Sequence, residues 1–249
     1  MVEYFSLNYP AEPFKLFSMS HNMMLGLILL ICLLIVSFRV NLRNAHTNKM
    51  FRYILASIMI LLEILIYVWL ISMDQWSITT SLPLHLCDVS IILSAIMLVN
   101  KSYSIYELTY FWGFGGAVQA LLTPDLGPFS FPHCVFYQFF LSHGSIVAAC
   151  IFMTFVEGYK PTQRSIRKTF VITNIYAVFI AVFNVITGSN YLFICQKPAN
   201  ASLLDFLGPW PWYVLALEFV LIFMCYLYYL PFVIYDLARG RGKGRHIKG

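Results

Sequence analysis

Long apolar runs, broken by short polar segments, form the main pattern of this chain. Seven of them approach or exceed the ~20 residues that a helix needs to cross about 30 Å of hydrocarbon. They cover residues 22–39, 51–73, 81–99, 104–123, 133–156, 168–188 and 211–235. None alternates with the period of two that a membrane β-barrel strand shows. The pattern predicts an all-α membrane protein, a seven-transmembrane-helix bundle, with residues 1–249 forming a single domain.

The basic residues predict the orientation of this bundle. With seven spans, all but Lys15 and Lys197 of the 16 Lys and Arg residues fall on the same side of the membrane. Cytoplasmic loops carry an excess of Lys and Arg, so the N-terminus is expected outside and the C-terminus in the cytoplasm. We therefore expect a multi-pass protein of the cell membrane.

Composition agrees with a membrane protein and narrows its partners. The chain is 60% hydrophobic and 11% charged, whereas soluble domains are about 25% charged. The basic cluster after the last span, residues 239–248, could suggest nucleic acid. A short basic cluster beside a membrane span more often contacts anionic lipid, so membrane lipid and not nucleic acid is the expected partner. No protein partner is indicated.

The six cysteines do not form a framework, because they are scattered and include no C-x-x-C motif. Cys134 and Cys195 both fall near the expected outer face, where a disulfide is chemically possible. The sequence gives no distance between them.

The sequence His85-Leu86-Cys87-Asp88 places an imidazole, a thiol and a carboxylate near the start of the third expected span. Ionisable groups are costly in a hydrocarbon helix and usually face the interior of a bundle, where they have a function. Most other polar residues of the spans also lie in the expected outer halves. This distribution predicts a polar cavity open to the outer side, with substrate-pocket candidates His85, Asp88, Gln119, Asn184 and Asn190. Packing between helices is the competing interpretation for the amides.

Cys87 is the candidate nucleophile. A nucleophilic thiol needs a base within hydrogen-bond reach. His85 is two positions away and points to a different side of a helix, whereas His85 and Asp88 share a face. The base is therefore expected from another span, and His143 is the histidine that lies deepest. A Cys87–His143 catalytic dyad is one interpretation, and a metal site built on His85, Cys87 and Asp88 is the other.

Four stretches of the chain resemble a known group of proteins. They are LPLHLC (82–87), GGAVQALLTPDL (115–126), FFLSHG (139–144) and NYLFICQKP with LLDFLGPWPWY (190–213). In combination these stretches resemble the YwaF-type bacterial integral membrane proteins, which are related to the transmembrane protein 164 family of acyltransferases. The resemblance implies transfer of a fatty acyl chain from a phospholipid to a lysophospholipid, through an acyl-enzyme on a cysteine assisted by a histidine. By their positions in the third and fifth spans, these residues map to Cys87 and His143.

The leading hypothesis is a cysteine-dependent acyltransferase or transacylase that acts at the outer leaflet. It needs no metal or other cofactor, because the donor ester supplies the energy. Oxyanion donors could be Gln119, Asn184 or a backbone N–H. A small transporter remains an alternative, although paired broken helices are not visible. A non-catalytic membrane assembly or sensing protein is the third class.

Overall fold

The structure is a computed structural model, and it describes residues 2–9, 12–198 and 203–240. Within these residues it contains helices and no strand. Five helices are long and apolar enough to cross a membrane: α1 (Met19–Ser37), α2 (Ala45–Ser72), α6 (Cys134–Phe155), α7 (Gln163–Thr187) and α8 (Trp212–Ala238). The all-helical architecture and the membrane-spanning character agree with the sequence, while the count of seven spans stays a prediction.

The third and fourth expected spans have a different form. The third is α3 (Leu86–Asn100), which has 15 residues and begins five residues later than expected. Residues 81–85, which include Pro83, are not helical. The fourth is a run of α4 (Tyr103–Thr109), a π-helical turn η3 (Tyr110–Phe114) and α5 (Gly115–Leu122). π-Helical turns inside α-helices are frequent at functional sites.

Capping residues explain where two helices start earlier than the hydropathy pattern suggests. Asn44 precedes α2, and its side chain accepts a hydrogen bond from the N–H of His46. Thr162 precedes α7 and forms a reciprocal pair with Ser165. Such caps satisfy N–H groups that the helix itself leaves free, so polar first turns extend both helices beyond their apolar parts.

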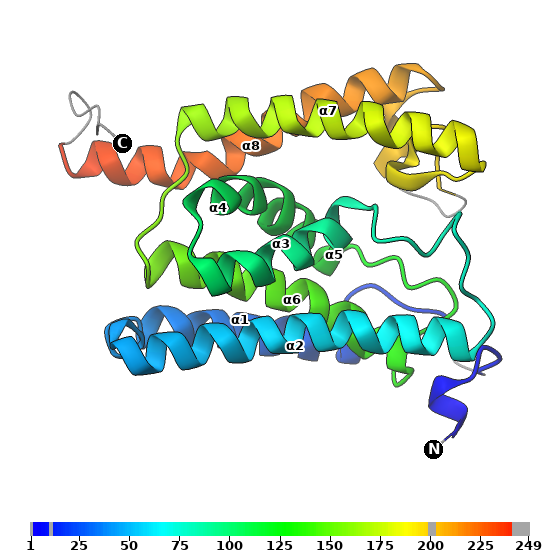
Figure 1. Cartoon of the computed structure of the whole chain (residues 1–249), viewed down its shortest axis with the longest axis horizontal. Helices are drawn as coiled ribbons and strands as arrows, with labels where there is room; N and C mark the ends of the chain where they lie inside the picture. Colours follow the sequence, from blue (N-terminus) through cyan, green and yellow to red (C-terminus); the bar gives the residue numbers. More distant parts are fainter. Residues whose placement is uncertain (1, 10–11, 199–202, 241–249) are drawn as a thin grey trace.

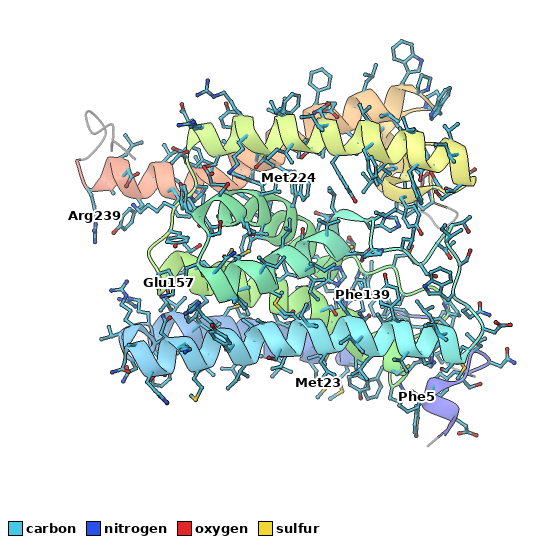
Figure 2. All side chains as sticks on the ribbon, viewed as in Figure 1. Phe5, Met23, Phe139, Glu157, Met224 and Arg239 are labelled. Carbon is cyan, nitrogen blue, oxygen red and sulfur yellow. The ribbon has the colours of Figure 1, made fainter. Side chains whose placement is uncertain are left out.

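The helices form three layers (Figure 1). α1 and α2 form one outer layer, α7 and α8 form the other, and α3 to α6 lie between them. Helix α6 is the most central of the long helices, because 13 of its 22 residues are buried. Side chains fill the space between the layers (Figure 2). Phe139 lies in the second turn of α6, and Glu157 follows its C-terminus.

One end of the bundle is basic. The helices α1, α3, α6 and α8 end there, and α2, α4 and α7 begin there. We call it the basic end, because it carries these residues: Arg39, Arg43, Lys49, Arg52, Lys101, Lys160, Arg164, Arg167, Lys168 and Arg239. The opposite end, where α3 and α6 begin, is called the site end. This asymmetry supports the expected orientation under the positive-inside rule, and the orientation itself remains a prediction.

Arginine side chains tie the basic end together. Buried Arg52 donates to the carbonyl of Leu98 and, at 3.0 Å, to that of Val99, at the end of α3. Arg43 donates to the carbonyl of Val156 at 2.9 Å, just after α6. Cations near a helix C-terminus satisfy carbonyls that have no partner inside the helix. The basic end is therefore held by hydrogen bonds as well as by packing.

Candidate functional site

The first turn of α3 is organised around Asp88. The N–H of His85, the residue before the helix, donates to Oδ2 of Asp88 over 3.2 Å. The thiol of Cys87 donates to Oδ1 of Asp88 over 3.4 Å. A carboxylate in the first turn is favoured by the helix dipole. Each oxygen of this carboxylate therefore has a hydrogen-bond partner within the four-residue motif.

A tyrosine from a distant loop holds the segment that leads into α3. The Tyr191 hydroxyl accepts a hydrogen bond from the N–H of Leu82 at 2.8 Å and donates to the carbonyl of Ile78 at 2.9 Å. Burial raises the pKa of the Tyr191 phenol above its ordinary value, so the hydroxyl keeps its proton. On α7, Tyr176 donates to the carbonyl of Leu84 at 2.9 Å. Two hydroxyls thus fix the backbone immediately before the motif.

Asn184 in turn fixes the loop that carries Tyr191. Its Nδ2 donates to the carbonyl of Tyr191 at 2.9 Å, and its Oδ1 accepts from the N–H of Tyr191 at 2.9 Å. Oδ1 also accepts from the hydroxyl of Ser189 at 2.8 Å. Asn184 is 1% exposed. Its side-chain amide is hydrogen-bonded within the protein, so Asn184 positions the loop.

His85 points its ring into the same loop. The N–H of Leu192 donates to Nδ1 of His85 over 3.4 Å. The rings of Tyr191 and Phe193 lie against the imidazole, each with its centroid 5.4 Å away. Because Nδ1 accepts a hydrogen bond, the neutral ring carries its proton on Nε2. His85 therefore presents a donor from Nε2 and not a base.

His143 has the opposite tautomer. It is the tenth residue of α6, and its Nδ1 lies 2.8 Å from the carbonyl of Phe139. A carbonyl can only accept, so Nδ1 carries the proton and Nε2 of the neutral ring has a free lone pair. The ring also packs on Phe139 with centroids 4.2 Å apart. Of these two histidines, His143 is the one prepared to accept a proton.

Gly113 of the π-helical turn shows how α3 and α6 are aligned. A Cβ on Gly113 would lie 2.7 Å from Ile146 on α6 and 3.4 Å from Cβ of Ser90 on α3. Ser90 and Ile146 therefore lie at the same depth. α3 and α6 run in the same direction, since both begin at the site end (Figure 1) and a 3.0 Å salt bridge joins Lys101 and Glu157, which follow their C-termini.

Cys87 and His143 are each three residues earlier than the aligned pair, or about one helical turn. Cys87 precedes Ser90 on α3, and His143 precedes Ile146 on α6. The two side chains are thus at similar depth on two helices in contact. No hydrogen bond joins them within the described residues. Cys87 is half-buried and His143 is 9% exposed.

The other two pocket candidates are more peripheral. Gln119 is half-buried on α5, and its side chain has no described hydrogen bond. Asn190 closes its own loop: Oδ1 accepts from the N–H groups of Cys195 and Gln196 at 3.2 and 3.1 Å. The structure brings His85, Cys87 and Asp88 together, joins them to Asn184 through Tyr191, and leaves Gln119 and Asn190 apart from these hydrogen bonds.

Further acidic and phenolic groups approach Asp88 from neighbouring helices. Glu63 and Tyr67 on α2 and Tyr176 on α7 all lie within electrostatic range of its carboxylate. Glu63, an acidic residue in the middle of α2, therefore interacts with an acidic residue of α3. The sequence does not single out Tyr67 and Tyr176, because a tyrosine in a span is an ordinary packing residue until its hydroxyl is located. Tyr191 lies in a loop, within one of the stretches that carry the resemblance, and the sequence gives it no role.

Neither cysteine pairing nor a metal cluster is present in the described part of the chain. Cys134 and Cys195 are both free. No group of three or more His, Cys, Asp and Glu side chains is arranged to hold a metal ion.

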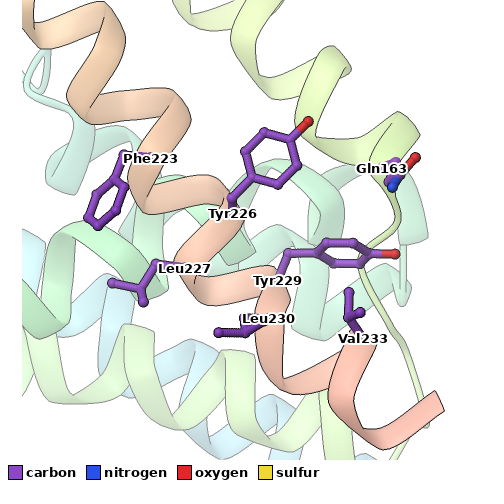
Figure 3. A pocket seen from close by; sticks show the side chains of 7 residues that line it. All are labelled: Gln163, Phe223, Tyr226, Leu227, Tyr229, Leu230 and Val233. Carbon is purple, nitrogen blue, oxygen red and sulfur yellow. The ribbon is translucent and has the colours of Figure 1, made fainter. Parts of the chain in front are cut away.

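Two apolar pockets lie elsewhere. One of about 800 Å³ lies between residues 4–5, α2 and α6. The other, of about 320 Å³, is lined mainly by α8 with Gln163 at its edge (Figure 3).

Comparison with known proteins gives the family. Residues 16–229 match the TMEM164 family. This chain belongs to that family. The matched range runs from the segment before α1 into α8, so it includes every residue of the candidate site. Neither a curated protein nor a solved structure matches the chain significantly. Membership in the TMEM164 family and the apolar helices together identify a membrane protein.

Proposed function

We propose that this TMEM164-family chain is an integral membrane acyltransferase or transacylase. It moves a fatty acyl chain from a phospholipid to a lysophospholipid through a thioester on Cys87. The reaction takes place at the site end, which the charge asymmetry assigns to the outer leaflet of the cell membrane. The observation that carries the proposal is the common depth of Cys87 and His143 on two helices that are aligned through Gly113.

The tautomers support the division of roles. Nε2 of His143 has a free lone pair, because Nδ1 donates to Phe139. In the proposed reaction Nε2 takes the thiol proton, and the sulfur of Cys87 attacks the ester carbonyl carbon of the donor. The tetrahedral intermediate then collapses, and the leaving alkoxide receives the proton from His143. In the second half an acceptor hydroxyl attacks the thioester with the same imidazole as base, and the thiol is regenerated.

The position of Cys87 suits this chemistry. It is the second residue of α3, so its sulfur lies beside N–H groups that the helix leaves free. Cys87 is only half-buried as a residue, which the approach of a lipid ester from the site end requires.

The test is an acyl adduct. Purified protein given a phospholipid donor should gain the mass of one acyl chain on Cys87, and neutral hydroxylamine should release it. Cys87→Ala should abolish the adduct, and Cys87→Ser should be severely impaired, since a hydroxyl is much less ionised than a thiol. Cys134→Ala is the matched control, because Cys134 is another half-buried thiol at the start of a helix at the same end. It should leave the adduct intact.

His143 should affect both halves of the reaction. His143→Ala should slow acylation and deacylation together, because one imidazole serves as base and then as acid. His85→Ala should have a smaller effect, since Nδ1 of His85 accepts a hydrogen bond from the N–H of Leu192 and is not free to act as a base. An adduct on a residue other than Cys87, or full lipid turnover by Cys87→Ala, would contradict the proposal.

A further inference from the structure

Two serine hydroxyls on α3 are buried without a partner. Ser90 and Ser94 are both 0% exposed. Neither Oγ has a hydrogen-bond partner within the described residues. Buried hydroxyls are normally hydrogen-bonded, and each exception in a folded protein needs an explanation. They are the two side-chain polar atoms of the described chain that are left in this state.

Ser90 is placed next to the candidate nucleophile. It is three residues after Cys87 on α3, so the two side chains share a face with about 5–6 Å between their Cβ atoms. The Cα–Cβ bonds of a helix tilt toward its N-terminus, so the hydroxyl of Ser90 is carried toward the level of Cys87. Ser94 lies one turn farther away on the same side.

The surroundings of Ser90 are closed and apolar. Its Oγ lies 3.8 Å from the point where a Cβ of Gly113 would be, and Ile146 of α6 reaches within 2.7 Å of that point. Gly113 and Ile146 are both buried. Cys87 is half-buried and Ser90 is fully buried, so the accessible part of this helix face ends between them. A hydroxyl dipole at such a boundary is screened little by water.

We infer that Ser90 is the oxyanion donor of the reaction. The inference rests on the proposed function. When the Cys87 sulfur forms its bond to the acyl carbonyl carbon, the carbonyl π-bond breaks and its electron pair moves onto oxygen. The Oγ–H of Ser90 donates a hydrogen bond to this oxygen, and the proton stays on Ser90. The interaction is strongest while the negative charge exists, which is the requirement for lowering the barrier.

This role explains why the hydroxyl has no partner in the free protein. An oxyanion donor must be directed at the place where charge develops, so a permanent acceptor inside the protein would compete with the substrate. Ser90 meets this requirement better than the amide of Asn184, which already donates to Tyr191. Asn184 was an oxyanion candidate by sequence, and its amide is occupied.

The experiment compares Ser90→Ala with Ser94→Ala in the full chain, reconstituted in phospholipid vesicles. The acyl adduct on Cys87 is followed over time by intact-protein mass spectrometry under single-turnover conditions. Binding of an ether-linked phospholipid, which Cys87 cannot cleave, is measured in parallel. Both substitutions remove an unbonded hydroxyl of equal burial, so neither should lower the thermal midpoint.

We expect Ser90→Ala to acylate about 100-fold more slowly than the parent, as when an oxyanion donor is lost. Its affinity for the ether lipid should be unchanged, and Ser94→Ala should acylate at the parental rate. Equal rates for parent and Ser90→Ala would overturn the assignment while leaving the Cys87 mechanism standing. Equal losses in both variants would overturn it too, because a packing effect would then be the cause. If the parent forms no adduct on Cys87, the proposed function fails, and this inference fails with it.

Discussion

The side-chain amide of Asn184 makes two hydrogen bonds to the backbone of Tyr191: Nδ2 donates to the carbonyl and Oδ1 accepts from the N–H, each at 2.9 Å. Tyr191 passes this constraint on, since its hydroxyl bonds the backbone at Ile78 and Leu82. Four residues after Leu82 the helix that carries Cys87 begins. The position of the thiol therefore depends on an amide in another helix that has no described contact with it.

Asn184→Ala should destabilise the protein and slow acylation of Cys87. It leaves the buried N–H and carbonyl of Tyr191 without partners, at a cost of about 1–3 kcal/mol for each group. Thermal unfolding in detergent and single-turnover acylation measure the two effects. Asn190→Ala is the matched control, because Asn190 also binds backbone groups of this loop, but its hydrogen bonds are exposed. Asn190→Ala should lose less stability than Asn184→Ala, and a larger loss in Asn190→Ala would contradict the prediction.

Tyr191→Phe should slow acylation more than its loss of stability explains. The variant keeps the ring and removes both hydrogen bonds that fix the segment before α3. Tyr110→Phe is a suitable comparison, since its hydroxyl donates to the carbonyl of Tyr228 at 3.0 Å, away from the site. Tyr110→Phe should lose about 1 kcal/mol of stability and Tyr191→Phe about 2 kcal/mol, at about 1 kcal/mol for each hydrogen bond. Only Tyr191→Phe should acylate slowly, and equal rates would show that the segment needs no such support.

Asp88→Asn distinguishes the two groups that could take the thiol proton. Asp88 accepts the hydrogen bond from Cys87 in the structure, whereas His143 has the free lone pair. If His143 is the base, His143→Gln should cost about 10²–10⁴ in rate and Asp88→Asn much less. Single-turnover rates of the two variants at one pH provide the comparison. A larger loss in Asp88→Asn would move the role of base to the carboxylate.

Gly113→Ala should destabilise the bundle and Gly116→Ala should not. A Cβ on Gly113 would meet Ile146 at 2.7 Å, and overpacking of this kind costs about 1–3 kcal/mol. Gly116, in the same helical run, has nothing within 4 Å of a new Cβ. Alanine there should stabilise the helix by about 0.5–1 kcal/mol. The thermal midpoints of both variants decide it, and equal midpoints would mean that α3 and α6 can separate at little cost.

The orientation can be measured with thiols. Cys195 is exposed and free at the site end, so a membrane-impermeant maleimide should label it in intact cells. With Cys134 and Cys195 changed to Ser, Lys49→Cys at the basic end should be labelled only after the cells are permeabilised. Labelling of Lys49→Cys in intact cells would reverse the assigned orientation, and the outer-leaflet assignment with it.

Hydropathy was sufficient to place the long helices, because a span of about 20 apolar residues has few alternatives to a helix in a membrane. It failed at the start of α3. Residues 81–85 were included in the expected span, but Pro83 and the hydrogen bonds with Tyr176 and Tyr191 keep them outside the helix. Pro83 is a local signal for a later helix start, whereas the hydroxyls lie on distant elements and a local pattern cannot reveal them.

The candidate site could be predicted in part. A thiol, an imidazole and a carboxylate in an apolar run mark Cys87, His85 and Asp88 without any structure. The role of Asn184 could not be inferred, because the sequence does not distinguish an asparagine that lines a pocket from one that holds a loop. Ser90 could have been found from helical periodicity, since it lies three residues after Cys87. What periodicity could not reveal is that its hydroxyl lacks a partner.

The shortness of α3 has a consequence for how a lipid could reach Cys87. Its 15 residues span about 22 Å, less than the ~30 Å of a bilayer's hydrocarbon. Non-helical backbone is tolerated at membrane depth only where protein surrounds it or water reaches it. The segment before α3 is half-buried and hydrogen-bonded to Tyr176 and Tyr191, so protein contacts this non-helical backbone. In the proposed reaction, the ester of a phospholipid would therefore meet Cys87 where a short helix begins, within the thickness of the bilayer and not at its surface.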